Sequence, residues 1–292
     1  IFVQSFNDSN GDGIGDFNGV TQKLDYIKEL GANAIWFMPI MPSPTYHKYD
    51  VTDYKAVHPD YGTMDDFKKL LEEAHKRDIK IVIDMIINHT STEHPWFQAS
   101  KSGRDNEFRD YYVWAQKDTI AAFLDKKVIT LDSDNIRQWH DPGQGADYYY
   151  GFFWGGMPDL NFDHPKVREE IYDIGRFWLE EVGVDGFRLD ALNFSMHDPD
   201  LRDNPPSGLP MELVTRPFDM QVKQFNQSHP DITGFLERIR ATIDEFPGRF
   251  TVAEVGGPEP LAEMKAFTEG GKRLDSAYNF DFLYAPRLTA PL

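Results

Sequence analysis

Two acidic residues, each at the end of an apolar run, could perform nucleophilic and acid–base chemistry. Asp190 ends the run Gly186–Asp190, and Glu254 follows the run Phe250–Ala253. Because side chains alternate along a strand, Arg188 should face the same way as Asp190 and keep it ionised. Glu254 has no compensating cation nearby in sequence, so burial should raise its pKa. An ionised carboxylate and a protonated one, about 5–5.5 Å apart, are what a retaining glycosidase uses as nucleophile and acid.

Each of these acidic residues also has a purely structural interpretation. Arg188 and Asp190 can form a buried ion pair, and Glu254 can be neutralised by a cation distant in sequence. The two carboxylates together favour catalysis, because they end consecutive predicted strands and would face each other.

Further polar residues follow two other predicted strands. His89 closes the segment Asp84–His89, and Tyr49 and Asp50 follow the second strand across a proline-rich loop. A ring beside a carboxylate suits a sugar, which offers an apolar face and hydroxyl groups. His89 could equally be a histidine of the core.

An oxygen-rich loop near the N-terminus indicates a cation site. Glycines permit a tight path, and oxygen donors recur at every second position: Asp8, Asn10, Asp12, the carbonyl of Ile14, and Asp16. Ca²⁺ prefers such ligands, although Gly19 stands where an EF-hand has its bidentate glutamate. We expect a structural Ca²⁺ here; the alternative is a metal-free loop held by Asx turns.

Apolar runs that alternate with helical patterns must position these residues. The predicted strands are Ile1–Phe6, Asn33–Ile40, Lys80–Asn88, Gly183–Ala191, Phe250–Val255 and Ser276–Tyr284. The predicted helices are Val20–Leu30, Met64–Arg77 (with Thr63 as its N-cap), Val167–Val182 and Ile232–Glu245. Strands that alternate with helices favour βαβ units and a parallel sheet.

Between Thr90 and Asp159 the alternation stops for about 70 residues, too long for an ordinary connection. Six strands with an insertion after the third predict an α/β fold, a (β/α)8 TIM barrel whose chemistry lies at the carboxyl ends of the strands. A doubly wound sheet is the alternative, but its glycine fingerprint is absent from the sequence. We divide the chain into barrel residues 1–89, an inserted domain 90–159 and barrel residues 160–292.

The composition excludes several classes of function. The chain has 292 residues, and 48 acidic against 30 basic residues give a formal charge of −18, which disfavours nucleic-acid and membrane partners. The absence of cysteine excludes disulfides, thiolate metal sites and cysteine nucleophiles. Because Ile1 already begins a predicted strand, we expect the natural start to precede it. Cytoplasmic, periplasmic and secreted locations all stay open.

Taken together, the strand-end motifs resemble the conserved regions of the α-amylase family of glycoside hydrolases. The matching segments are Asp84–His89, Met157–Asn161, Gly186–Asp190 and Phe250–Val255. The resemblance covers essentially the whole chain and implies a barrel domain A with a domain B after its third strand. It implies that Asp190 is the nucleophile and Glu254 the general acid/base. The residues that would hold the sugar at the cleavage site are Tyr49, Asp50, His89 and Arg188.

Finer features point in two directions within the family. His197–Pro206 and Ala253–Gly257 resemble bacterial α-glucosidases of the oligo-1,6-glucosidase subgroup, whereas Thr45–Asp50 and Tyr148–Gly156 resemble α-amylases. Aromatic residues of the last segment, such as Phe153, should lie over the pocket.

Three residues just beyond the nucleophile bear on linkage specificity and on metal binding. Ala191 is small, which by family likeness favours α-1,4 bonds. Asn193 and Phe194 replace the Lys-His of many α-amylases, which argues against the second Ca²⁺ site of those enzymes.

We therefore expect a retaining enzyme that cleaves α-1,4-glucosidic bonds in malto-oligosaccharides or starch-like glucans. The alternatives are a family isomerase or transglycosylase, which would form trehalose or a sucrose isomer, and a non-catalytic sugar-binding scaffold. The sequence stops at Leu292, just after the sixth predicted strand, whereas the family's third catalytic carboxylate follows the seventh. We thus expect strands seven and eight to be missing and the 292 residues alone to be inactive.

Overall fold

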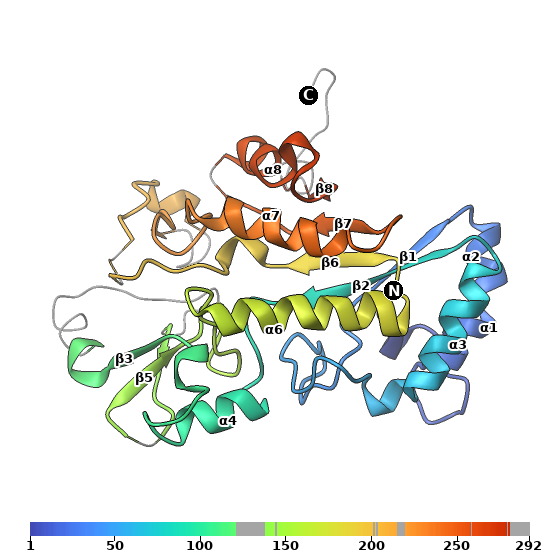
Figure 1. Cartoon of the computed structure of the whole chain (residues 1–292), viewed down its shortest axis with the longest axis horizontal. Helices are drawn as coiled ribbons and strands as arrows, with labels where there is room; N and C mark the ends of the chain where they lie inside the picture. The colour runs from blue at the N-terminus through green and yellow to red at the C-terminus, as the bar shows by residue number, and fades with distance from the viewer. Residues whose placement is uncertain are drawn as a thin grey trace.

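A five-stranded parallel sheet runs through the middle of the molecule (Figure 1). The computed structural model describes residues 1–120, 138–143, 145–200, 202, 204–214, 220–257, 259–278 and 280. In sheet order the strands are β1 (Ala34–Phe37), β2 (Lys80–Ile86), β6 (Gly186–Asp190), β7 (Phe250–Ala253) and β8 (Ser276–Ala277). All neighbouring pairs are parallel, so the carboxyl ends of the strands lie along the same edge.

In Figure 1, helices α6 and α7 lie alongside the strands of the sheet, and α1, α2 and α3 lie near the end of β1. The α-helices are α1 (Phe17–Gln22), α2 (Leu24–Glu29), α3 (Met64–His75), α4 (Pro95–Lys101), α6 (Pro165–Arg176), α7 (Ile232–Ile243) and α8 (Pro260–Thr268). Short 3₁₀ turns are η1 (Val3–Ser5), η2 (Pro59–Tyr61), η3 (Arg109–Tyr111), η5 (Leu192–Phe194), η6 (Met211–Leu213) and η8 (Glu269–Gly271). A π-helical segment, η4 (Phe177–Val182), continues α6.

Helix α3 shows how local sequence sets an element. The predicted N-cap is confirmed, because the hydroxyl of Thr63 accepts from the N–H of Asp66 while the Asp66 carboxylate accepts from the N–H of Thr63. Such a cap contributes about 1 kcal/mol. Phe67, Leu70 and Ala74 lie on one face and are fully buried against the core, and each large apolar side chain stabilises the fold by roughly 1.5–3 kcal/mol.

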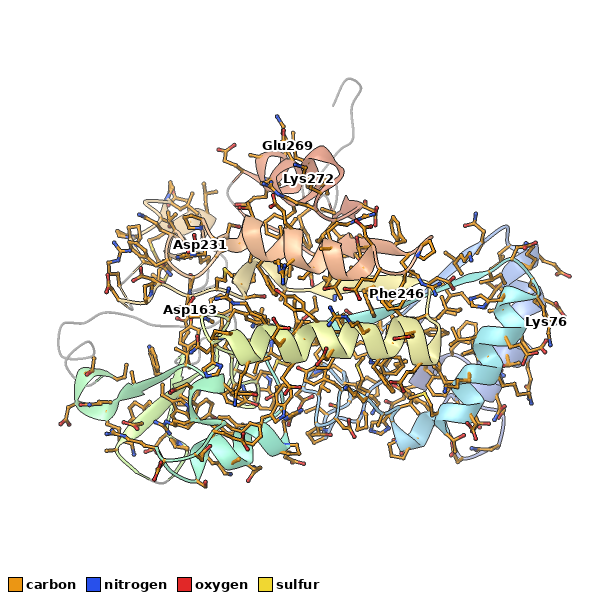
Figure 2. The ribbon with its side chains drawn as sticks, viewed as in Figure 1. Lys76, Asp163, Asp231, Phe246, Glu269 and Lys272 are labelled. Carbon is orange, nitrogen blue, oxygen red and sulfur yellow. The ribbon has the colours of Figure 1, made fainter. Side chains whose placement is uncertain are left out.

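Helices α6 and α7 run antiparallel to the strands. Figure 2 shows Asp163 and Asp231, which precede the two helices, at the end of the sheet toward which β2 and β6 run, and Phe246, which follows α7, at the opposite end. The helices contact each other through Tyr172 of α6 and Phe235 of α7, whose ring centroids lie 6.2 Å apart. This is the geometry of consecutive βα units.

A second, antiparallel sheet lies within the predicted insertion. Its strands are β3 (Trp114–Gln116), β5 (Asp147–Tyr150) and β4 (Trp139–His140), in that spatial order. In Figure 1 this sheet and α4 lie beyond the carboxyl ends of β2 and β6. It has a small apolar cluster of its own, formed by Ile120, Trp139, Tyr150 and Phe152. The bounds 90–159 themselves stay a prediction.

The predicted first strand, Ile1–Phe6, is wrong. Only Ile1 joins the sheet edge, where its ammonium group donates to the Trp36 carbonyl at 2.7 Å and its carbonyl accepts from the Met38 N–H at 3.0 Å. Residues 3–5 form η1 instead. The reason is the glycine-rich loop, whose Gly15 N–H donates to the Gln4 carbonyl at 2.8 Å and so binds the segment away from the strand direction.

Other elements differ from the predictions at their ends. The predicted helix Val20–Leu30 is two helices, because α1 ends and α2 begins around Lys23. The predicted helix Val167–Val182 widens into η4 and ends at Gly183, whose φ of 92° favours glycine. The strand predicted over Ser276–Tyr284 is formed at Ser276–Ala277, and most of its remainder lies outside the described residues.

In the part of the chain that the structure describes, no helix combines the length and the apolar character required to cross a membrane.

Candidate active site

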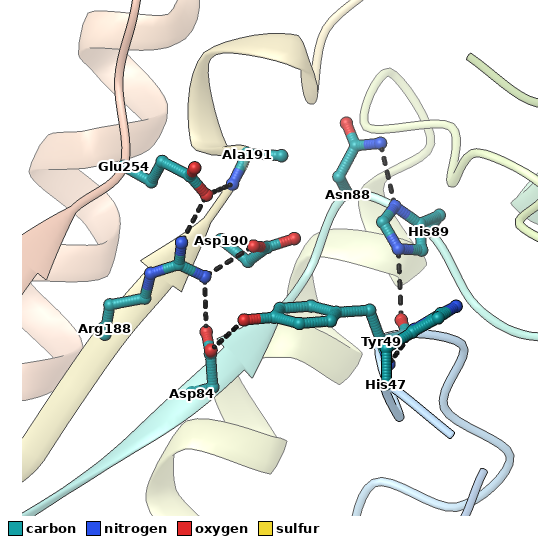
Figure 3. A network of polar contacts seen from close by, with 9 residues as sticks. All are labelled: His47, Tyr49, Asp84, Asn88, His89, Arg188, Asp190, Ala191 and Glu254. Atoms are coloured by element: carbon teal, nitrogen blue, oxygen red, sulfur yellow. Dashed lines mark hydrogen bonds and ion pairs between the residues drawn. The ribbon is translucent and has the colours of Figure 1, made fainter. Parts of the chain in front are cut away.

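The carboxyl ends of β6 and β7 bring Asp190 and Glu254 to one guanidinium group (Figure 3). Arg188 Nη1 lies 2.5 Å from Asp190 Oδ1, and its Nη2 is ion-paired with Glu254 Oε2. The pairing of β6 with β7 confirms that the two acidic residues end neighbouring strands. Their predicted separation of about 5–5.5 Å stays a prediction.

The same guanidinium binds a third carboxylate from a third strand. Arg188 Nη1 lies 2.8 Å from Oδ1 of Asp84, which is fully buried in the middle of β2. Burial raises the pKa of Asp84, and the positive charge of Arg188 opposes that rise. Arg188 therefore joins the middle of β2 to the carboxyl ends of β6 and β7.

Aromatic rings enclose Arg188. Its guanidinium carbon lies 5.1 Å from the ring centroid of Trp36, 5.6 Å from that of Tyr278 and 6.0 Å from that of Tyr49. Only 5% of the Arg188 side chain is exposed. Cation–π attraction strengthens when the cation is desolvated, so the rings hold the charge in place without neutralising it.

Glu254 has the electrostatics of a proton donor. Burial raises its pKa to about 7, and the negative charge of Asp190 adds to the rise. Arg188 and the N–H of Ala191, 3.4 Å from Oε2, oppose it. A carboxyl group with a pKa near 7 is protonated in a substantial fraction of molecules at neutral pH.

Tyr49 and His89 lie beside the carboxylates and are hydrogen-bonded to each other (Figure 3). The Tyr49 hydroxyl donates to Asp84 Oδ2 at 3.0 Å, and burial raises the pKa of Tyr49. The Asn88 amide contacts His89 Nδ1 at 3.2 Å, and His89 Nε2 contacts the Tyr49 carbonyl at 3.1 Å. Because an amide N–H donates and a carbonyl accepts, this arrangement fits a neutral ring protonated on Nε2. Burial lowers the pKa of His89 in agreement.

Asp50 lies in the loop that carries Tyr49 and is 1% exposed. Its Oδ1 accepts hydrogen bonds from Ser43 Oγ at 2.6 Å and from Thr45 Oγ1. These two hydroxyl groups fix the carboxylate from its own loop.

Phe153 reaches the site from the inserted region. Its ring centroid lies 5.4 Å from that of His89, edge to face, and 5.6 Å from that of Phe194. The ring thus lies against a predicted sugar-binding residue, and its place over the pocket stays a prediction.

Asp159 is a site-shaping residue that the sequence reasoning did not single out. It is fully buried, its Oδ2 lies 3.0 Å from His197 Nε2, and its Oδ1 accepts from the Phe152 N–H at 3.1 Å. Its backbone forms a β-bridge with His89. Asp159 therefore joins the inserted region to two strand-end loops. Its place within the Met157–Asn161 motif was the available signal.

Ala191 follows Asp190 with a left-handed backbone, φ 45° and ψ 33°. L-residues adopt this conformation at a cost, and β-branched residues do so least readily. The backbone therefore tolerates the small side chain that the sequence singled out better than it would tolerate a β-branched one.

The oxygen-rich loop folds onto its own amides. Asp8 accepts from the N–H groups of Gly11 and Gly13 at 2.7 and 2.8 Å, and Asp12 Oδ1 accepts from that of Ile14 at 2.8 Å. Asn10 Oδ1 accepts from the N–H of Asp12. These are the Asx turns of the metal-free alternative. Among the residues the structure describes, no cluster of three or more His, Cys, Asp or Glu side chains could hold a metal ion.

Asp16 has a separate role at the end of this loop. It is the N-cap of α1, where Oδ1 accepts from the Gly19 N–H at 2.6 Å, and its carboxylate also accepts from the Ser9 hydroxyl and N–H. Both oxygens are thus engaged by the protein, and the Ca²⁺ site stays a prediction.

Comparison with known proteins places these features in a wider context. Residues 1–291 match the model of the alpha-amylase family, "Alpha amylase, catalytic domain". A "Probable alpha-glucosidase" of Rhizobium meliloti is 40% identical over 99% of this chain and 53% of its own length. The "Trehalose synthase/amylase TreS" of Mycolicibacterium smegmatis is 37% identical over 99% of this chain and 44% of its own.

A solved structure shows the same architecture. The "alpha-glucosyl transfer enzyme, XgtA" superposes with a TM-score of 0.87 at 39% identity, and the alignment covers 97% of this chain and 53% of that protein. The chain therefore spans about half the length of the relatives it matches.

Proposed function

Because the chain belongs to the α-amylase family, we propose that it carries the reacting carboxylates of a retaining enzyme that cleaves α-1,4-glucosidic bonds in malto-oligosaccharides or starch-like glucans. One observation carries the proposal: Asp190 and Glu254 end neighbouring strands and share the Arg188 guanidinium, while burial raises the pKa of Glu254 to about 7. An oriented carboxylate beside a protonated one can act as nucleophile and acid.

The reaction proceeds through two displacements at the anomeric carbon. Asp190 attacks that carbon and forms an ester, while Glu254 gives its proton to the departing glycosidic oxygen. Water then attacks the same carbon and gives a proton to the Glu254 carboxylate, and Asp190 leaves as a carboxylate. Two inversions restore the α configuration.

The surrounding residues hold the sugar. Tyr49 and Phe153 offer ring faces, and Asp50 offers a carboxylate to hydroxyl groups. His89, whose two ring nitrogens are held by Asn88 and by the Tyr49 carbonyl, fixes the position of Tyr49 and lies against the Phe153 ring. Ala191 leaves room beside the nucleophile on the leaving-group side, which by family likeness favours α-1,4 bonds.

We divide the chain as the sequence indicates, with barrel residues 1–89 and 160–292 and an inserted domain over residues 90–159. The antiparallel sheet β3-β5-β4 supports the inserted domain, and the parallel sheet supports the barrel. We place the substrate between them, at the carboxyl ends of the parallel strands.

The loop at Asp8–Asp16 would hold Ca²⁺ as a structural ion. Its donor groups are hard oxygens, and Asp8, Asn10 and Asp12 are exposed, as a loop that takes up an ion from solution requires. Positive φ angles at Gly11 and Gly13 permit the tight path. The ion would stabilise the first loop and take no part in bond cleavage.

A second candidate function is glycosyl transfer to a sugar, which would form trehalose or a sucrose isomer. It is favoured by the similarity to the transferase XgtA and to the trehalose synthase/amylase. The same two carboxylates serve both reactions, and the acceptor in the second displacement distinguishes them. A non-catalytic scaffold is disfavoured, because both carboxylates are present.

Trapping of the covalent intermediate in the full-length protein tests the nucleophile. A 5-fluoro-α-glucosyl fluoride should label the peptide that contains Asp190, and the Asp190→Asn variant should not be labelled. A label on another residue, or a product of inverted configuration by NMR, would refute the mechanism. Products from maltose, sucrose and starch then separate the two functions: free glucose indicates hydrolysis, and a rearranged disaccharide indicates transfer.

A further inference from the structure

One buried side-chain amide connects the loops that follow the two reacting carboxylates. Asn193 lies three residues after Asp190 and is 1% exposed. Its Nδ2 donates to the carbonyl of Gly256 at 2.5 Å and to Ser228 Oγ at 3.1 Å. Gly256 lies two residues after Glu254, so this amide links the nucleophile loop to the acid/base loop. The side-chain amide of Gln227 donates to the same Gly256 carbonyl at 2.6 Å.

The chemistry of its partners fixes how this amide is oriented. The Gly256 carbonyl can only accept, and the Ser228 hydroxyl uses its proton to bind Glu263 Oε2 at 2.6 Å. A flipped amide would place an oxygen against two acceptors. Oδ1 of Asn193 is buried and has no hydrogen-bond partner within the described part of the chain. The Asn193 amide therefore acts only as a donor, to Gly256 and to Ser228.

Ser228 and Glu263 anchor the amide from the opposite side. Ser228 has a left-handed backbone with φ 52°, and its N–H donates to the Asn193 carbonyl at 2.6 Å. Such backbone strain persists where surrounding contacts impose it, often at functional sites. Glu263 Oε1 would lie 2.9 Å from a Cβ added at Gly257, so the acid/base loop passes closely over this carboxylate. Residues 254–257 thus rest on the hydrogen-bonded chain Asn193–Ser228–Glu263.

We propose that Asn193 is a positioning residue for the general acid: by holding the Gly256 carbonyl, it places Glu254 within reach of the leaving-group oxygen. The inference rests on the proposed function of Glu254. Proton transfer needs the two heavy atoms about 2.6–3.2 Å apart, and a displacement of about 1 Å can cost roughly 100-fold in rate. Asn193 touches neither the substrate nor the reacting atoms, and it acts through the loop.

Two substrates that differ only in the leaving group separate this role from general damage. A 2,4-dinitrophenyl α-glucoside leaves with little help from an acid, whereas a methyl α-glucoside needs the proton. In the full-length protein, Asn193→Leu keeps the size of the side chain and removes both hydrogen bonds. We expect kcat/KM to fall about 100-fold for the methyl glucoside and less than about threefold for the aryl glucoside.

A second variant and a control complete the test. Ser228→Ala keeps the bond to Gly256 but frees the amide to rotate, and it should give a smaller loss with the same bias toward the methyl glucoside. Asn204→Leu removes an amide that makes two hydrogen bonds elsewhere in the same loop region, and it should show no bias. Equal losses on both substrates, or no loss, in Asn193→Leu would overturn the proposal. If that variant does not fold, the bias in Ser228→Ala decides.

A readout without turnover separates this inference from the proposed function. The carboxyl ¹³C shift of Glu254 reports its titration, which depends on its distance from Arg188 and Asp190. A displaced loop in Asn193→Leu should change that pKa, and an unchanged pKa would overturn the positioning role. Wild-type protein that cleaves neither glucoside would count against the proposed function alone.

Discussion

Replacing Arg188 with methionine should destabilise the protein, and most strongly above neutral pH. Methionine fills much of the same space among the aromatic rings but carries no charge. Among the described residues, Arg188 is the only cation ion-paired with Asp84, Asp190 or Glu254. Removing one partner of a buried ion pair costs about 3–5 kcal/mol. At about 2.1 cal/mol/K per residue, a chain of 292 residues should then melt about 5–8 °C lower.

The pH dependence follows from the protons that the orphaned carboxylates would bind. Burial already raises the pKa of Asp84 and of Glu254 in the wild type, and the charge of Arg188 opposes the rise. Without Arg188 these two pKa values rise further above the unfolded values, so the folded variant binds more protons than the folded wild type at the same pH. Their contribution to stability is complete below the unfolded pKa and is lost as pH rises through the folded pKa. The stability gap from wild type should therefore narrow on acidification, by about 1.4 kcal/mol per pH unit for each additional proton bound.

Urea denaturation between pH 5 and 8 measures this gap. Arg188→Lys is the matched control, since it keeps the charge and loses the planar fork, and its gap should depend less on pH. If Arg188→Met is destabilised equally at every pH, ring packing and not charge would be the contribution of this residue, and the electrostatic reasoning would be refuted.

Three further predictions concern the acid, the metal and the linkage. Since Glu254 must be protonated and burial raises its pKa to about 7, kcat/KM should fall as pH rises through about 7. Glu254→Gln should lower kcat/KM for alkyl glucosides by about 10²–10⁴-fold, and the fall in kcat/KM above pH 7 should disappear. If the variant keeps that fall, another group must be responsible for it. Ca²⁺ at 100 times its Kd should stabilise the protein by about 2.7 kcal/mol, and the double substitution Asp8→Ala, Asp12→Ala should abolish the shift; a wild-type melting temperature indifferent to Ca²⁺ would favour the metal-free loop. Ala191→Val should lower the ratio of kcat/KM for maltose over isomaltose by at most about 10–200-fold. It should also lower the melting temperature, because φ is 45° at this position and β-branched residues adopt this conformation least readily. A wild-type enzyme that already prefers isomaltose would contradict the linkage assignment.

The sequence by itself determined the elements whose cause is local. Thr63 and Asp66 form a capping box within four residues, so the start of α3 could be read directly. The apolar runs that end at Asp190 and precede Glu254 predicted strands, and those strands are neighbours. Cap chemistry and side-chain alternation act over a few residues, and they do not depend on the rest of the fold.

Contacts between distant residues were decided only by the tertiary structure. The sequence suggested that Arg188 faces Asp190, two residues away, but not that it also binds Asp84 and Glu254, which lie 104 and 66 residues away. Those pairs exist because the registers of β2, β6 and β7 bring their ends together. Register depends on the packing of the whole sheet, which no single segment encodes.

The first six residues and Asn193 both form contacts that local sequence patterns do not predict. An apolar segment at Ile1–Phe6 reads as a strand, yet hydrogen bonds from Gly15 and its loop bind it as a 3₁₀ turn. Asn193 reads only as a departure from the α-amylase pattern, yet its amide meets Gly256, 63 residues away. Gly15 lies eleven residues beyond Gln4, outside the few residues over which strand alternation can be read. Gly256 lies 63 residues beyond Asn193, and their contact forms only once the sheet has brought the two loops together.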